Sequence, residues 1–503
     1  MNTPMIRYII GWVLALEGLF MLLPCAVAVI YSESTGWYFA AVSAGAVVLG
    51  FLLSAKKPGN NEIYIQEGCV ATALSWIVLS LVGCLPFYLS GEIPVFVDAV
   101  FETVSGFTTT GASILSYVED LSYCMIFWRS FTHWLGGMGV LVFLLAVLQL
   151  PGGYHMNLMK AESPGPVVGK LRPKVRQTAQ ILYLIYLGMT VAEVVLLLIG
   201  NMPLFDALTI SFGTAGTGGF GIKNDSMMSN TPYQQWVVAI FMMLFGVNFN
   251  FYYLLLFRRW KEAFRIEEVR NYLLVILVSI AIIMLNLGWG AMGFLDTLRH
   301  VAFQVSSIIT TTGYSTIDFD AWPEASHTVL LVIMYIGACA GSTGGGIKVS
   351  RLTLAAKQIF REIRSYVTPR RVESIEMDGH PVDPAVLHSV NIFFVAYVLI
   401  ATVSIFLLSL EDYDPVTNFS AVAATLNNIG PGLSKVGPTG NFGFFRPLSK
   451  VVLIFDMLAG RLELYPILLL FYPGCWRDLF RGSRPKRKRA LIHNPHRTKA
   501  ASH

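Results

Sequence analysis

Long apolar stretches recur along the whole sequence and restrict the fold more than any other feature. They occupy residues 8–30, 37–53, 70–89, 181–199, 236–257, 390–410 and 451–472. Each is long enough to cross the hydrocarbon layer of a bilayer, which is roughly 30 Å thick. Three less uniform stretches at 127–150, 273–289 and 329–340 bring the expected membrane spans to ten. We therefore predict an all-α membrane protein.

Basic residues gather in alternate connections between these stretches. The clusters fall at residues 56–57, 160–176, 258–270, 351–371 and 484–489. Lys and Arg are retained on the cytoplasmic side of a membrane, so these connections and both termini are expected there. The intervening loops carry mainly acidic charge, which would either concentrate cations at an entrance or be ordinary solvated loop charge.

Four segments between paired apolar stretches share one pattern, an amphipathic stretch that ends in a polar, glycine-bearing turn. They cover residues 101–113, 208–221, 303–315 and 420–432. The turns read Thr-Thr-Thr-Gly-Ala (108–112), Ala-Gly-Thr-Gly-Gly (215–219), Thr-Thr-Thr-Gly-Tyr (310–314) and Asn-Asn-Ile-Gly-Pro (427–431). We align them on Gly111, Gly218, Gly313 and Gly430. An internal repeat of this kind defines the architecture before any single motif does.

The repeat predicts four units around one pore, each made of a helix, a re-entrant pore helix, a filter loop and a second helix. Two leading transmembrane helices occupy residues 1–66. The pore repeats are assigned to 67–165, 166–268, 269–378 and 379–476, and a basic cytoplasmic tail to 477–503.

The four turns have the chemistry of an ion filter. Irregular backbone inside a membrane is tolerated only where it is buried in protein or lines a wet cavity. Glycine permits backbone angles that aim carbonyl oxygens inward, and Thr hydroxyls add uncharged oxygens, so such a ring can replace the water shell of a monovalent cation. The predicted filter residues are Thr109, Thr110, Gly111, Thr217, Gly218, Thr311, Thr312, Gly313, Asn428, Ile429 and Gly430. Because the turns differ, the pore should lack true fourfold symmetry.

On these residues the chain resembles the TrkH membrane subunits of bacterial Trk potassium uptake systems, in the superfamily that includes KtrB and plant HKT transporters. The likeness covers nearly the whole length and extends to the motifs WLGGMG (134–139), ACAGSTGGGIK (338–348) and LAGRLE (458–463). The two leading helices favour TrkH over the shorter KtrB. Asp456, in the last span, and a long basic tail depart from the family pattern.

The resemblance implies potassium uptake across the bacterial inner membrane, with K⁺ as the ion bound in the filter. It also implies a homodimer with one pore in each protomer, and control by a cytoplasmic nucleotide-binding regulatory ring of the TrkA type. Plant relatives that favour sodium replace the first-repeat glycine by serine, so glycine at every aligned position favours potassium. A sodium-permeable channel, or a potassium symporter coupled to sodium or protons, is the alternative.

The glycine cluster at 341–346 would interrupt the second helix of the third repeat, because each glycine costs roughly 1 kcal/mol relative to alanine in a helix interior. In the family this break is an intramembrane loop beneath the filter that obstructs ion flow. The resemblance carries that gating role to Gly344, Gly345, Gly346 and Lys348. A plain helix kink is the alternative.

Arg461 lies in an apolar stretch, where a charge usually faces a pore or a partner. It resembles the arginine that family members place under the filter, where it would act as an electrostatic barrier. A salt bridge to Glu463 or Asp456, or snorkelling to the surface, is the other interpretation.

Other polar residues are given structural roles. Glu102, Asp206 and Asp296 fall near the expected starts of re-entrant helices, and capping is preferred to ion coordination for the latter two. Asn248 and Asn250 are interpreted as interhelical hydrogen-bond partners. The histidines form no cluster and receive no role.

An enzyme is not expected. The composition, with 54% hydrophobic and 13% charged residues, excludes an ordinary soluble protein. We find no nucleophile–base pair, metal motif or cofactor site in the sequence. The basic run at 486–489 is interpreted as an anchor on anionic membrane lipids, or as a contact with the regulatory ring, rather than as a nucleic-acid site.

Overall fold

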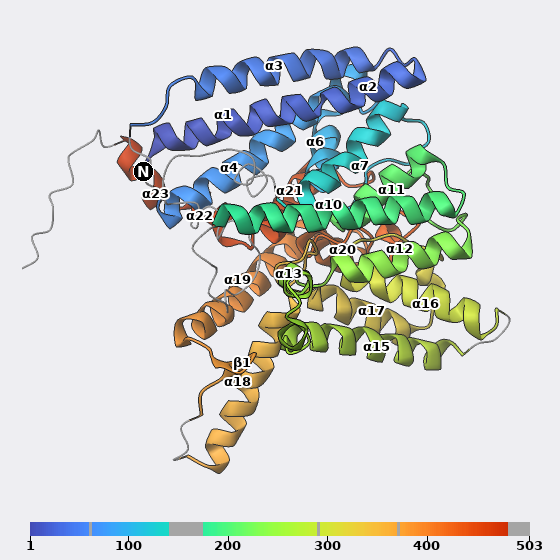
Figure 1. Cartoon of the computed structure of the whole chain (residues 1–503), viewed down its shortest axis with the longest axis vertical. Helices are drawn as coiled ribbons and strands as arrows, with labels where there is room; N and C mark the ends of the chain where they lie inside the picture. The colour runs from blue at the N-terminus through green and yellow to red at the C-terminus, as the bar shows by residue number, and fades with distance from the viewer. Residues whose placement is uncertain (60–62, 140–174, 289–291, 370–372, 481–503) are drawn as a thin grey trace, which may run out of the picture.

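A computed structural model describes residues 1–59, 63–139, 175–288, 292–369 and 373–480 (Figure 1). Within these ranges the chain is mostly helical and has almost no strand, which confirms the predicted fold class. The strands described are β1 (Glu376–Met377) and β2 (His380–Pro381), which pair antiparallel in a short hairpin. The basic cluster at 484–489 lies outside the described residues.

Three leading helices form two antiparallel spans at one edge of the molecule, next to the first repeat, and the first two helices together make one span (Figure 1). They are α1 (Thr3–Phe20), α2 (Leu22–Tyr31) and α3 (Gly36–Ser54). α1 and α3 approach closely because both carry glycine at the crossing: a Cβ on Gly11 would lie 2.8 Å from the carbonyl oxygen of Gly50. The Ser43 hydroxyl donates to the Gly18 carbonyl at 2.6 Å, which adds a buried polar contact between the two helices.

Four units of the same order follow the leading helices. The first contains α4 (Ile65–Gly83), α5 (Leu85–Ser90), α6 (Phe96–Phe107) and α7 (Tyr123–Gly137). The second contains α10 (Val175–Ile199), α11 (Leu204–Gly216), α12 (Pro232–Phe245), α13 (Phe249–Leu256) and α14 (Trp260–Ala263). The third contains α15 (Glu267–Leu287), α16 (Phe294–Ile309), η1 (Phe319–Ala321), α17 (Glu324–Ile336) and α18 (Val349–Val367). The fourth contains α19 (Pro384–Ser409), α20 (Pro415–Leu426), η2 (Ser434–Val436), α21 (Pro447–Arg461), α22 (Tyr465–Phe471) and α23 (Pro473–Phe480).

The short pore helices α6, α11, α16 and α20 connect the four units in a closed circle. Each pore helix packs against the helix that follows it in its own unit. It also packs against the helix that follows the pore helix of a neighbouring unit. α6 contacts α7 and α21, α11 contacts α12 and α7, α16 contacts α17 and α12, and α20 contacts α21 and α17. The fourth unit therefore closes onto the first, and the pore helices surround one axis.

In the part of the chain that the structure describes, six helical segments are long and apolar enough to cross a bilayer, so the chain is a multi-pass membrane protein. They are Thr3–Tyr31, Gly36–Ser54, Ile65–Ser90, Ala179–Ile199, Glu267–Leu287 and Pro384–Ser409. The ten expected spans also included the second helix of each repeat, and the described part of these helices is short or interrupted. α12 and α13 bend by 90° at their junction, α17 ends at Ile336 and α21 ends at Arg461.

The distribution of side chains is that of a membrane protein with a polar interior. Large apolar side chains on the outer helices are exposed, such as Leu285, Val395 and Leu399. Polar side chains at the ends of the pore helices are completely buried, including those of Thr108, Thr310 and Asn427. Buried polar groups need hydrogen-bond partners or an occupant. Each of these three side chains donates to a carbonyl of its own pore helix, so the centre of the circle is polar although it lies inside the protein.

Candidate functional site: a ring of four turns

Each pore helix ends in a turn with the same backbone path. One residue in each turn adopts a left-handed conformation, with φ of 55° at Thr109, 56° at Thr217, 60° at Thr311 and 55° at Asn428. The N–H of the next residue donates to the carbonyl five residues earlier at 2.8–2.9 Å. These bonds run from Thr110 to Ser105, Gly218 to Gly213, Thr312 to Ser307 and Ile429 to Ala424. The structure thus brings together all four turns proposed from the sequence, and it fixes their register.

That register corrects the alignment of the second turn. The glycine two residues after the left-handed residue has a positive φ in every turn: Gly111 (79°), Gly219 (73°), Gly313 (88°) and Gly430 (95°). Gly218 instead occupies the position of Thr110, Thr312 and Ile429. The alignment on Gly218 was wrong by one residue because this turn contains glycine at 216, 218 and 219, and only backbone angles distinguish them.

The four glycines contact the neighbouring turns in a closed ring. A Cβ atom on Gly111 would overlap the carbonyl oxygen of Gly218, one on Gly219 that of Thr312, and one on Gly313 that of Ile429. A Cβ on Gly430 would lie 2.8 Å from the carbonyl oxygen of Thr110, which closes the circle. Each turn therefore abuts the next in the order of the sequence. Positive φ and lack of space both require glycine at these positions.

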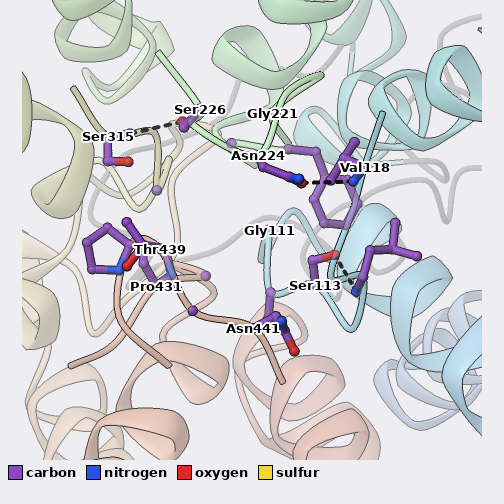
Figure 2. A pocket seen from close by; sticks show the side chains of 18 of the residues that line it. Gly111, Ser113, Val118, Gly221, Asn224, Ser226, Ser315, Pro431, Thr439 and Asn441 are labelled. Carbon is purple, nitrogen blue, oxygen red and sulfur yellow. Dashed lines mark hydrogen bonds between the residues drawn. The ribbon is translucent and has the colours of Figure 1, made fainter. Parts of the chain in front are cut away.

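A polar cavity opens at one end of this ring, as Figure 2 shows. Its floor includes Gly111, Gly219, Gly313 and Gly430, and its walls come from segments 112–118, 220–226 and 436–442. The walls are hydrogen-bonded to one another. Asn224 Oδ1 accepts from the Val118 N–H at 2.8 Å, and Ser226 Oγ accepts from the Ser315 N–H at 3.1 Å. The cavity leads directly to the four glycines.

Arg129 lines the cavity, but a buried ion pair offsets its charge. Its Nε atom lies 2.5 Å from Glu102 Oε1, and its guanidinium group lies 3.5 Å from the centre of the Phe220 ring. Glu102 also accepts from the Ile114 N–H at 3.0 Å. Glu102 is in the middle of α6, so the expectation that it lies near a helix start is wrong. It connects the first pore helix to the loop after the first turn.

The other predicted polar roles have different outcomes. Asp206 and Asp296 lie in the first turns of α11 and α16, where a carboxylate interacts favourably with the helix dipole. Asp296 also pairs with Arg299 at 2.6 Å. Asn248 donates to Glu268 on another helix at 3.4 Å, which confirms its interhelical role.

Side chains also join neighbouring turns. His133 Nδ1 lies 2.8 Å from the Gly106 carbonyl, and His133 Nε2 accepts from the Phe220 N–H at 3.3 Å. A carbonyl can only accept, so the proton is on Nδ1 and the imidazole is neutral. His133 therefore connects the first pore helix to the second turn. The sequence alone indicates no role for His133, because a single His in an apolar stretch has no local signature.

Two further contacts continue around the ring. The Tyr314 hydroxyl lies 3.2 Å from the Ile210 carbonyl and 3.3 Å from the Phe220 carbonyl, which joins the third turn to the second repeat. The Asn428 amide donates to Thr110 Oγ1 at 2.9 Å, which joins the fourth turn to the first. The order of the four turns is thus supported by side chains as well as by packing.

Residues 337–348 interrupt the second helix of the third repeat, between α17 and α18. The Gly345 N–H donates to Thr311 Oγ1 at 2.6 Å, and the Gly346 N–H donates to the Asn427 carbonyl at 3.0 Å. The Lys348 ammonium donates to the Gly344 carbonyl. The segment contacts residues that precede the ring glycines, whereas the cavity is lined by residues that follow them. The segment and the cavity therefore lie at opposite ends of the turns.

Arg461 lies beside this segment. Its guanidinium group donates to the Thr343 carbonyl at 3.0 Å and to the Gly137 carbonyl at 2.7 Å. The carboxylates considered as its partners have other contacts: Glu463 pairs with Arg351 at 2.5 Å, and Asp456 accepts from Ser404 at 2.7 Å. Arg461 therefore links the interrupted helix of the third repeat to the end of α7.

The fold and the site define a class of membrane protein in which four repeats of one chain surround a single polar axis. A family model described as a cation transport protein, TrkH, matches residues 35–474. The chain is 38% identical to the Trk system potassium uptake protein TrkH of Salmonella typhimurium, over 95% of this chain and 100% of that protein. It is 37% identical to the Trk system potassium uptake protein TrkH of Escherichia coli K12, with the same coverage.

A solved structure also matches this chain. The chain matches the crystal structure of the potassium transporter TrkH from Vibrio parahaemolyticus with a TM-score of 0.83 and 33% sequence identity. The match covers 95% of this chain and 100% of that one. The chain therefore belongs to the TrkH family of cation transport proteins.

Proposed function

We propose that this chain takes up potassium across the bacterial inner membrane through the ring of four turns. The observation that carries the proposal is the closed circle in which each ring glycine abuts a carbonyl of the next turn. A ring of carbonyl and hydroxyl oxygens can replace the hydration shell of a monovalent cation without adding a fixed charge. The relatives described as potassium uptake proteins support potassium as the ion.

The proposed route begins at the polar cavity and passes through the ring to the interrupted helix. With both termini in the cytoplasm, the cavity faces outward and residues 337–348 lie on the inner side. The K⁺ ligands are proposed to come from Thr109, Thr110, Gly111, Thr217, Gly218, Gly219, Thr311, Thr312, Gly313, Asn428, Ile429 and Gly430. The glycines in this set supply close backbone approach, and the threonines supply hydroxyl oxygens.

We assign control of the pore to the intramembrane loop and to Arg461. The loop contacts two of the four turns directly, so an ion leaving the ring meets its backbone. Arg461 places a positive charge beside the loop, and a fixed positive charge opposes the passage of cations. A cytoplasmic nucleotide-binding ring of the TrkA type would release the loop, and two protomers, each with its own pore, would form the assembly.

A sodium-permeable pore is a second candidate because the fourth turn differs from the first and third. Asn428 and Ile429 occupy the positions that Thr109 and Thr110 have in the first turn. Thr311 and Thr312 have the same positions in the third turn. The fourth turn therefore supplies no hydroxyl oxygen at these positions. Fewer well-placed ligands would weaken discrimination between potassium and sodium.

Radiotracer rubidium uptake into liposomes carrying the purified protein tests the proposal, since rubidium closely resembles potassium. Excess potassium is expected to compete with rubidium, and excess sodium is not. Equal competition by both ions would contradict potassium selectivity. The Arg461→Ala variant, which removes the proposed barrier, is measured in parallel. Uptake by this variant alone would show that the native pore is able to conduct but is closed. Absence of uptake in both proteins would contradict conduction through the ring.

A further inference from the structure

The four junctions between neighbouring turns are held in two different ways. His133 bridges the first and second repeats, Tyr314 the second and third, and Asn428 the fourth and first. Among the described residues, no side-chain hydrogen bond runs directly between the third turn (310–314) and the fourth (427–431), although further along the loops the Asp320 carboxylate accepts from the Ser434 backbone. That junction is bridged by the intramembrane loop, through the Gly345 N–H on Thr311 and the Gly346 N–H on the Asn427 carbonyl.

Thr109 and Thr311 show what the loop changes at a single position. Both are threonines with the same left-handed backbone, at φ of 55° and 60°, and both are completely buried. Thr109 Oγ1 has no hydrogen-bond partner among the described residues. Thr311 Oγ1 accepts the Gly345 N–H at 2.6 Å. The two hydroxyl oxygens therefore lie at equivalent positions of the ring, but only that of Thr311 is hydrogen-bonded to the loop.

The loop is fixed at its ends and is adjustable between them. The Glu268 carboxylate, which is buried, accepts from the Ala340 N–H at 2.6 Å and from the Ser350 N–H at 3.1 Å. Between these two anchors, Gly341 and Gly346 have positive φ, a region that glycine enters and leaves at little cost. Between the anchors the segment is also held by Arg461 at the Thr343 carbonyl and by the Phe249 N–H at the Gly341 carbonyl. Movement of the tip that contacts the turns therefore requires only local changes at these glycines and bonds while both ends stay in place.

We infer that the Thr311 hydroxyl is the latch of the intramembrane loop, and that the loop and a cation compete for this one oxygen. The inference rests on the proposed function. When the Gly345 N–H occupies the oxygen, it places the positive end of a peptide dipole where a cation would bind. When the tip is released, the Thr311 oxygen becomes available to bind a cation, and the bridge between the third and fourth turns is lost. A cation bound at the inner end of the ring would in turn favour release.

Thr311→Val tests the latch because it keeps the side-chain shape and removes the acceptor. Thr109→Val is the matched control, since it makes the same change at the equivalent position that the loop does not touch. Rubidium leak into liposomes, without a regulatory subunit, is expected to rise about two- to tenfold in Thr311→Val over Thr109→Val, the range for one neutral hydrogen bond. Thr311→Ser keeps the hydroxyl and should restore a low leak.

A second measurement follows the loop itself rather than ion flux. Ser342, in the tip, is replaced by cysteine, and its labelling by a maleimide is compared with that of the parent chain. Labelling should be faster in potassium than in choline buffer, and Thr311→Val should remove this difference. Equal leak in the two valine variants, or labelling that does not depend on potassium, would overturn the latch and leave the filter intact. No rubidium uptake by any variant, Arg461→Ala included, would overturn the proposed function and the latch with it.

Discussion

The ring of turns and the layer beneath it differ sharply in symmetry. In the ring, the left-handed residues of the four turns agree to within a few degrees, with φ from 55° to 60°. Beneath it, each repeat ends its second helix differently. α7 ends at Gly137, α12 bends by 90° into α13, α17 gives way to a glycine-rich loop, and α21 ends at Arg461.

The contacts made by each layer explain this difference. In the ring, every glycine abuts a carbonyl of the neighbouring turn, so a change in one repeat displaces the next. In the layer beneath, each segment makes its own hydrogen bonds. Arg461 donates to the Thr343 carbonyl, and the Gly345 N–H donates to the Thr311 hydroxyl. A change there removes the contacts of one side chain or segment, such as the two carbonyls that Arg461 reaches, and leaves the ring contacts in place. Four repeats can therefore retain one filter geometry while they diverge in the parts proposed to control it.

The largest effect is expected from a substitution in the ring of turns, which is the symmetric layer. In Gly219→Ala, the new Cβ would overlap the Thr312 carbonyl at a backbone angle that alanine rarely adopts. Rubidium uptake should fall more than tenfold, because strain of this kind costs on the order of 1–3 kcal/mol before any clash is counted. Gly188→Ala on α10, where an added Cβ meets open space, is the control and should keep both uptake and elution profile. Normal uptake by Gly219→Ala would refute the corrected register.

A smaller effect of opposite sign is expected in the asymmetric layer at Arg461. Arg461→Ala removes the bonds to the Thr343 and Gly137 carbonyls together with the charge. Rubidium leak should rise roughly tenfold, since hydrogen bonds of a charged group contribute about 1.5–3 kcal/mol. Arg461→Lys keeps the charge but not the planar fork of donors. A leak as low as that of the native chain in the lysine variant would assign the effect to charge, whereas an unchanged flux in the alanine variant would contradict a gating role.

Glu268 is expected to have a weaker effect because it fixes only the ends of the loop. The Ala340 and Ser350 N–H groups donate to the same oxygen of Glu268, so the carbonyl oxygen in Glu268→Gln can still accept both, but the negative charge that strengthens these bonds is lost. Leak should rise by a few fold, which is less than for Arg461→Ala. Glu267→Gln is the matched control at the adjacent position, where the carboxylate contacts Lys357 instead of the loop. Equal leak in the two variants would remove the role of Glu268 as an anchor.

The sequence predicts the local parts of this site and misses the distant ones. The turns, and the glycine cluster at 341–346, are recognisable because each is a short pattern beside an apolar stretch. Glu268 lies 72 residues from Ala340, and His133 lies 87 residues from Phe220, so no local pattern connects them. Arg129 and Glu102 likewise form an ion pair only in the folded chain. The second turn was misaligned because three of its five residues are glycines.

The smallest expected effect concerns the start of the fourth pore helix, which differs from the starts of the other three. Asp414 caps α20 by accepting from the Thr417 N–H at 2.9 Å, whereas Val95, Pro203 and Gly293 precede the other pore helices and have no side-chain acceptor. Asp414→Ala should lower the free energy of unfolding by about 1 kcal/mol, as for loss of a helix N-cap.

The pH dependence of this cap has a definite sign. Hydrogen bonds from the Thr417 hydroxyl and N–H lower the pKa of the Asp414 carboxyl. Its stabilisation is thus complete above the unfolded pKa, roughly 3.9, and is lost as pH falls through the lower folded value. Thermal unfolding in detergent should separate native protein from Asp414→Ala at pH 7, and the gap should narrow at about pH 3. Asp414→Asn keeps an acceptor that does not titrate, so its difference from the alanine variant should persist at both pH values. A gap between native and Asp414→Ala that is unchanged by acid would assign the stabilisation to something other than the ionised carboxylate.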